Sequence, residues 1–308
     1  MFKKTALSLA LLLAGTVAQA NVLTSIKPLG FIANAITDGV TDTTVLLPVT
    51  ASPHDYSLKP SDMAALQSAQ LVVWIGDEME GFLAKSVAKL PQEKVFTLEK
   101  IAEIEKLVVS SDHDHDHDHD HDHETHAHSH HDHHHDHDKD WHVWLSPQIS
   151  QQIAEQIADR LSQKMPEQAA KIAQNLAQFK QALTEKHQQI EAQLSPLKAK
   201  GYYTFHDAYG YFERAYGLNS LGAFTINPTV APGAKTLTKI KQHIAKNQAK
   251  CLFAEPQFTP KVIASLAQYT DAKIGQLDPL GAQITLSKTA YTEFLQSLAD
   301  QFSQCLAQ

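Results

Sequence analysis

The chain of 308 residues contains no cluster of lysine and arginine, and its formal net charge is −8. Proteins that bind nucleic acid need a basic patch to neutralise the phosphate backbone, so that class of protein is excluded. After the first 20 residues no further long hydrophobic run occurs, which leaves no second segment able to cross a bilayer. The HExxH and GxSxG motifs of zinc proteases and serine hydrolases are also absent. The sequence therefore carries no recognisable mark of a hydrolase.

Cysteine is scarce, because only Cys251 and Cys305 are present. Their separation rules out a CxxC redox centre, and two lone cysteines in an oxidising export compartment are expected to pair. A disulfide that closes a loop of more than about 50 residues would add about 4 kcal/mol to the free energy of unfolding. We therefore predict a disulfide between these two residues if the chain is exported.

Residues 1–20 have the composition of a cleavable secretory signal. Lys3 and Lys4 form a positive start, residues 5–14 are apolar, and residues 18–20 form a small-x-small cleavage site. We expect cleavage directly after this site, with a retained signal anchor as the alternative. No cysteine lies there, so a lipid anchor of the bacterial lipoprotein type is not expected. Losing the two lysines makes the mature chain more acidic, which suits a protein that collects cations.

The rest of the chain alternates short apolar runs with segments of helical periodicity, a pattern typical of parallel α/β sheets. Two four-stranded, mainly parallel sheets fit these runs better than one continuous sheet. The predicted strands are residues 22–26, 45–47, 71–75, 95–98, 202–205, 220–224, 251–254 and 274–277. The helices predicted around them are residues 29–37, 61–68, 79–90, 208–216, 233–245, 260–269 and 290–306.

The middle of the chain is predicted to be helical and to connect two α/β lobes. Ser146 followed by Pro147 is a helix start, since serine caps helices and proline is tolerated at their first position. From Pro166 to Leu194 apolar residues recur at steps of three and four, which predicts a helix of roughly 43 Å that would act as a rigid linker. The predicted N-terminal lobe, linking helix and C-terminal lobe are residues 21–165, 166–195 and 196–308.

Fourteen of the 19 histidines lie between Asp112 and Asp140, mostly in alternation with aspartate. This histidine-rich segment has no aliphatic residue larger than Ala127, so residues 112–140 are predicted to be a disordered surface loop. Neutral imidazole is a preferred ligand of zinc, nickel and copper. The segment is therefore expected to hold several metal ions weakly. Examples of the expected ligands are His115, His117, His119 and His121.

Three of the five remaining histidines lie where α/β proteins bind ligands, at the carboxyl ends of strands or beside a helix start. His54 follows the second predicted strand, His206 directly follows the fifth, and His142 lies just before the helix start at Ser146. Asp278 directly follows the last predicted strand. Three imidazoles with a carboxylate or a water form a common tetrahedral zinc set, so we predict a metal site in a cleft to which both lobes contribute.

The residues alone leave two questions open at this site. The fourth ligand is either Asp278 or a water molecule. Glu255, after the third strand of the second lobe, is a candidate for orienting one of the imidazoles, with an ordinary hydrogen-bonded carboxylate as the alternative. His187 and His243 lie on predicted helices and are not assigned to the site.

Four motifs, in this order, resemble those of the metal-binding receptors of bacterial ABC importers. They are SPHDYSLKPSD at residues 52–62, WHVWLSP at 141–147, YTFHDAY at 203–209 and LDPLG at 277–281. The match covers essentially the whole mature chain and, with the acidic histidine-rich segment, is closest to the periplasmic zinc-binding receptors. The resemblance implies a C-clamp of two lobes joined by one long helix. It also implies that His54, His142 and His206 are the zinc ligands.

The resemblance further implies a monomeric, non-enzymatic receptor in the periplasm of a Gram-negative cell. Such a receptor captures Zn²⁺ and delivers it to an ABC permease in the inner membrane, and the histidine-rich segment would serve as a weaker zinc store. Manganese-binding relatives usually carry a carboxylate at the third position, so His206 favours zinc. Pro53 is a departure, because close zinc receptors can have a glutamate there that offers a further contact.

Three other functions remain as alternatives. A zinc hydrolase would use a metal-bound water as its nucleophile. A manganese or iron receptor could be built on the same scaffold. A surface adhesin is the third alternative, although the missing anchor cysteine counts against it.

Overall fold

The computed structural model describes residues 21–109, 139–225, 249–256 and 270–307, together with single positions between 237 and 268. Within these residues the chain forms two four-stranded sheets in which all strand pairs are parallel. The strand orders are β2-β1-β3-β4 and β6-β5-β7-β8, so the two lobes share one topology. The predicted fold class of two α/β lobes is confirmed.

The N-terminal lobe contains all four strands that the apolar runs predict. Its strands are β1 (Asn21–Thr24), β2 (Asp42–Val45), β3 (Leu71–Trp74) and β4 (Val95–Thr97). Its helices are α1 (Lys27–Thr37), α2 (Pro60–Ser68), α3 (Gly81–Val87) and α4 (Ala102–Glu105). The strand β2 begins three residues earlier than predicted, because it is an edge strand with alternating exposure rather than a continuous apolar run.

The C-terminal lobe also contains the four predicted strands. They are β5 (Tyr202–His206), β6 (Ser220–Thr225), β7 (Cys251–Ala254) and β8 (Lys273–Gln276), and they occur with the helices α7 (Gly210–Tyr216) and α10 (Ala290–Leu306). The helices predicted at residues 233–245 and 260–269 lie largely outside the described residues. The predicted signal, residues 1–20, lies outside them altogether.

Two helices follow the described start at Lys139, namely α5 (Pro147–Lys164) and α6 (Ala169–Leu194). The predicted cap is confirmed, because Ser146 Oγ accepts a hydrogen bond from the backbone N–H of Ile149 at 3.2 Å. Residues Pro166–Gln168 form a 3₁₀ turn, so the long helix begins at Ala169 and spans about 39 Å. No helix among the described residues is long and apolar enough to cross a membrane.

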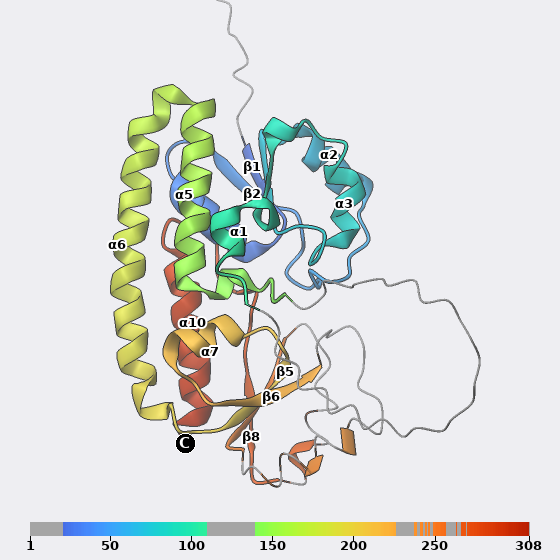
Figure 1. Ribbon diagram of the computed structural model, residues 1–308, viewed down its shortest axis with the longest axis vertical. Helices are drawn as coiled ribbons and strands as arrows, with labels where there is room; N and C mark the ends of the chain where they lie inside the picture. The colour runs from blue at the N-terminus through green and yellow to red at the C-terminus, as the bar shows by residue number, and fades with distance from the viewer. Residues whose placement is uncertain are drawn as a thin grey trace, which may run out of the picture.

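The long helix α6 lies along one side of the molecule, with α5 beside one half of it and α10 beside the other (Figure 1). It therefore connects the lobes as part of a packed helical layer rather than as a free-standing linker.

One hydrophobic core also runs through both lobes, from Leu23 and Phe31 to Phe294 and Phe302 of α10. Each buried ring contributes on the order of 2–3 kcal/mol, so this shared core holds the two sheets against each other.

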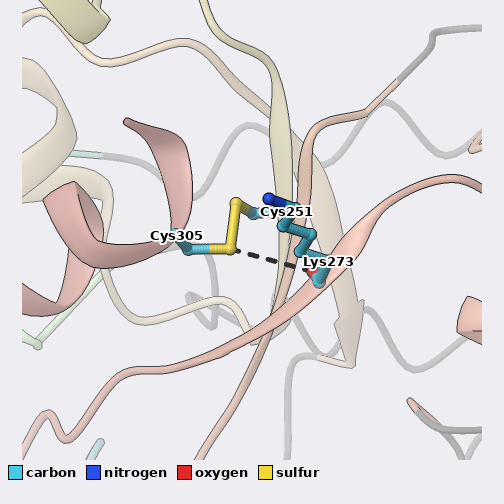
Figure 2. Close-up of a disulfide and its surroundings, with 3 residues drawn as sticks. All are labelled: Cys251, Lys273 and Cys305. Atoms are coloured by element: carbon cyan, nitrogen blue, oxygen red, sulfur yellow. Dashed lines mark hydrogen bonds between the residues drawn. A yellow bond between two sulfur atoms is a disulfide. The ribbon is translucent and has the colours of Figure 1, made fainter. Parts of the chain in front are cut away.

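The predicted disulfide is confirmed. Cys251 at the start of β7 is bonded to Cys305 in the last turn of α10, and their Cα atoms are 6.2 Å apart. Figure 2 shows the bridge beside β8, where the carbonyl oxygen of Lys273 lies 3.8 Å from Cys305 Sγ. The bond ties α10 to an inner strand of the C-terminal sheet.

Candidate metal-binding site

Three histidine rings from distant parts of the chain meet where the two lobes face each other. His54 lies in the loop between β2 and α2, His142 directly precedes the short 3₁₀ turn before α5, and His206 is the last residue of β5. The ring centroid of His54 lies 5.3 Å from that of His142 and 5.2 Å from that of His206. The centroids of His142 and His206 are 4.8 Å apart. One nitrogen of each ring lies within 4.8 Å of the others, so one ion could contact all three.

The nitrogens of these rings are mostly without hydrogen-bond partners. Among the described residues, six buried side-chain nitrogen or oxygen atoms lack a partner, and four of the six belong to His54, His142 and His206. Buried polar atoms are nearly always paired, so their concentration at one place indicates a ligand site. Imidazole nitrogens in this number suit a zinc ion. With His142 6% and His206 3% exposed, a bound ion would be largely shielded from solvent.

The carboxylate of Asp140 holds the His142 ring in one orientation. Its Oδ1 lies 2.8 Å from Nδ1 of the ring and also accepts the backbone N–H of His142 at 3.0 Å. A carboxylate only accepts hydrogen bonds at neutral pH, so Nδ1 carries the ring proton and Nε2 presents a lone pair. This is the tautomer that binds a metal through Nε2.

Glu255 lies beside His206, as the strand positions suggested. Its Oε1 is 3.5 Å from Nδ1 of the ring, which is too long for a strong hydrogen bond. The same oxygen accepts a hydrogen bond from the hydroxyl of Tyr209 at 3.1 Å. A role for Glu255 in orienting His206 therefore remains a prediction.

Asp278 is not part of the three-histidine group. Its Oδ1 accepts the backbone N–H of Leu280 at 3.1 Å and its Oδ2 that of Ala282 at 2.6 Å. Lys27 of α1 donates to the carbonyl oxygen of Ala282 at 2.7 Å and so attaches this turn to the other lobe. The carboxylate of Asp278 thus stabilises the turn after β8. The choice between Asp278 and water as the fourth ligand stays a prediction.

Asp140 is the contact that the sequence interpretation missed. Lys139 and Asp140, the last two residues of the predicted loop 112–140, are among the described residues. An acidic residue two positions before His142 was a usable signal, but the run of aspartate and histidine concealed it. The histidines proposed as weak metal sites lie outside the described residues: His115, His117, His119 and His121.

Burial and the two neighbouring imidazoles disfavour a charge on His54 and lower its pKa from 6.5 to about 2. Below pH 6.5 the unfolded chain binds a proton here that the folded protein does not, so stability falls as the pH falls. In the metal-free protein, the titration of His54 should lower the free energy of unfolding by about 2 kcal/mol as the pH falls from about 7 to 5. The variant His54→Gln should lack that part of the pH dependence, as urea unfolding of both proteins would measure.

The comparison between these two proteins isolates His54 from other titrating groups. Burial raises the pKa of Glu80 and of Glu213 to about 7. Folded protein then keeps protons that the unfolded chain releases, so these glutamates add stability as the pH falls, opposite to His54. Both are common to wild type and variant. An identical change of unfolding free energy in the two proteins would contradict the prediction.

Two parallel α/β lobes, a long connecting helix and three imidazoles at the junction of the lobes, two of them buried, define a two-lobed metal-binding receptor. The chain matches the family described as "Zinc-uptake complex component A periplasmic" over residues 22–305, and it belongs to that family. The resemblance seen in the four sequence motifs is thereby confirmed.

Known proteins of this kind resemble the chain over its whole length. The high-affinity zinc uptake system protein ZnuA of Haemophilus ducreyi is 67% identical over 311 residues, which cover 100% of both chains. The protein of that name from Haemophilus influenzae is 50% identical, covering 100% of this chain and 99% of its own. The structure of the periplasmic zinc-binding protein TroA from Treponema pallidum has a TM-score of 0.74 at 19% identity, covering 94% of this chain and 100% of that one. This last likeness shows a common fold.

Proposed function

We propose that this protein is a periplasmic receptor that captures Zn²⁺ at the three-histidine site and delivers it to an ABC permease for high-affinity uptake. The observation that carries the proposal is the approach of one nitrogen each from His54, His142 and His206 to within 4.8 Å of one another, between the lobes. Membership of the zinc-uptake family and the names of the closely similar relatives support zinc as the cargo. The protein binds and releases its cargo without chemical turnover.

The three neutral imidazoles would replace most of the hydration shell of Zn²⁺, and a water would occupy the fourth position. His142 and His206 are held by neighbouring backbone elements and are nearly buried. Little ordering is then needed when the ion arrives, which favours tight binding. Nitrogen ligands also favour zinc over manganese, which prefers oxygen ligands.

Release of the ion needs a movement that breaks at least one of these contacts. The core shared by both lobes opposes their separation. His54 lies in a loop between β2 and α2 and is the least buried of the three histidines. We therefore assign release to a displacement of the His54 loop when the receptor docks on the permease, rather than to an opening of the lobes.

The histidine-rich segment would act as a second, weaker store of zinc. It carries fourteen imidazoles, and Asp140 at its end contacts His142, so ions held there lie close to the main site along the chain. A high local concentration of ions favours transfer to that site. Deleting residues 113–138 removes these imidazoles and keeps Asp140.

Titration with Zn²⁺ against a chelator of known affinity tests both parts of the proposal. We expect the wild-type protein to bind several equivalents, one of them tightly, and the variant lacking residues 113–138 to keep only the tight one. Excess Mn²⁺ should not displace that ion. Loss of the tight equivalent in the deletion variant would place the main site in the histidine-rich segment instead. Displacement of zinc by Mn²⁺ would reverse the choice of cargo.

A further inference from the structure

The residues that flank the histidine-rich segment, Val109 and Asp140, are hydrogen-bonded to each other and to a tyrosine of the opposite lobe. The backbone N–H of Asp140 donates to the carbonyl oxygen of Val109 at 2.9 Å. The hydroxyl of Tyr211, on α7 of the C-terminal lobe, donates to the carbonyl oxygen of Asp140 at 2.6 Å and accepts the N–H of Val109 at 3.2 Å. We call these three residues, Val109, Asp140 and Tyr211, the neck.

The tyrosine of the neck is itself held in place. Tyr211 is 5% exposed, and the guanidinium of Arg214, one turn further along α7, lies 5.0 Å from the centre of its ring. On the other side of the neck, Lys139 Nζ lies 2.9 Å from Glu105 Oε1. These contacts hold the Tyr211 ring, so that its hydroxyl can fix the backbone of Asp140.

The neck contacts the metal site through the side chain of Asp140. Its Oδ1 lies 2.8 Å from Nδ1 of His142, and the two side chains are 11% and 8% exposed. In such a poorly solvated place the negative charge acts strongly on the ring. Among the described residues, the rings of His54 and His206 have no carboxylate at comparable distance, since Glu255 is 3.5 Å from His206. His142 is thus the imidazole whose direction is most firmly set.

We propose that Asp140 and Tyr211 are a pair of positioning residues for His142. Asp140 fixes the tautomer and the direction of the ring, and Tyr211, from the opposite lobe, holds Asp140 in place. The inference rests on the proposed function, because it takes His142 to be a zinc ligand. A carboxylate that accepts the N–H of a metal-bound imidazole raises the basicity of that ring, and its removal typically weakens metal binding by about 10- to 100-fold.

Chelator competition for one Zn²⁺ on full-length variants tests the pair. Asp140→Asn keeps the shape of the side chain but loses its charge and should weaken binding about 10-fold, and Asp140→Ala about 100-fold. Tyr211→Phe removes only the hydroxyl and should weaken binding by less than about 10-fold, a smaller loss than either, since it acts indirectly. Because Tyr211 acts through Asp140, Asp140→Ala combined with Tyr211→Phe should bind as weakly as Asp140→Ala alone.

The matched control is Tyr216→Phe, which removes a hydroxyl on the same helix that contacts Nδ1 of His187 at 3.2 Å instead of the neck. Its zinc affinity should equal that of the wild type. Co²⁺ bound in place of zinc provides a second readout, since its d–d absorption bands report ligand geometry. These bands should change in Asp140→Asn and remain as in the wild type in Tyr216→Phe.

Wild-type affinity in Asp140→Asn and Asp140→Ala would overturn the role of Asp140, and independent, additive losses would overturn its coupling to Tyr211. Weaker binding with unchanged Co²⁺ bands would indicate a general loss of stability and would also overturn the positioning role. Failure of the wild-type protein to bind zinc would instead refute the proposed function, so the two failures are distinguishable.

Discussion

Replacing His206 by alanine is expected to weaken zinc binding by about 100-fold or more. His206, at the end of β5, is the member of the three-histidine group that the C-terminal lobe contributes. Structural zinc sites with four ligands are worth roughly 10–16 kcal/mol, so one ligand accounts for about 3 kcal/mol, which corresponds to about 100-fold in affinity. The variants His54→Ala and His142→Ala should show losses of the same order. Chelator competition on the protein lacking residues 113–138 measures them without the additional weak sites.

His187→Ala is the matched control for these substitutions. His187 lies on α6, where its Nδ1 is 3.2 Å from the hydroxyl of Tyr216, and it does not belong to the three-histidine group. Its replacement should leave zinc affinity unchanged. Wild-type affinity in His206→Ala, or an equal loss in His187→Ala, would argue against coordination by the three rings.

Removing the disulfide is expected to lower the free energy of unfolding by about 4 kcal/mol in the chain-entropy description of loop closure. Cys251 and Cys305 are 54 residues apart in the sequence, so the bond restricts a long loop of the unfolded chain. It also fastens α10, which carries Phe294 and Phe302 of the shared core. Urea unfolding of metal-free Cys251→Ala/Cys305→Ala against the wild type measures the loss.

Zinc affinity of this double variant should stay at the wild-type level while the protein is folded. Cys251 begins β7, whereas the three-histidine site lies near the opposite, carboxyl ends of the strands. Reduced wild type provides the control, since it should unfold at nearly the same urea concentration as the double variant. A loss of stability below about 1 kcal/mol would contradict the large contribution assigned to loop closure.

The strands were predictable because parallel sheets covered on both faces require short, continuous apolar runs. Leu71–Trp74 and Cys251–Ala254 are buried throughout, and their predicted bounds agree with the structure to within one residue. The edge strand Asp42–Val45 differs from its predicted range because its exposed positions are polar and give no continuous apolar run. The apolar residues used to predict it, Leu46 and Leu47, follow the strand and pack in the core.

The three histidines could be proposed from the sequence because His54 and His206 follow predicted strands and His142 precedes a helix start. Their mutual approach could not, since it depends on long-range packing of α6 and α10 and on a core that includes Phe31 and Phe294, 263 positions apart in the sequence. The hydrogen-bond partners of Asp278 could not be predicted from the sequence either. Spacing does not reveal that Leu280 and Ala282 donate to the Asp278 carboxylate.

A crystal structure of the protein with one equivalent of Zn²⁺ tests the central claim most directly. We predict a single anomalous-scattering peak at the junction of the lobes, about 2.0–2.1 Å from one ring nitrogen each of His54, His142 and His206. For His142 that nitrogen should be Nε2. A zinc ion bound elsewhere, or one coordinated by fewer than these three rings, would contradict the proposed receptor site.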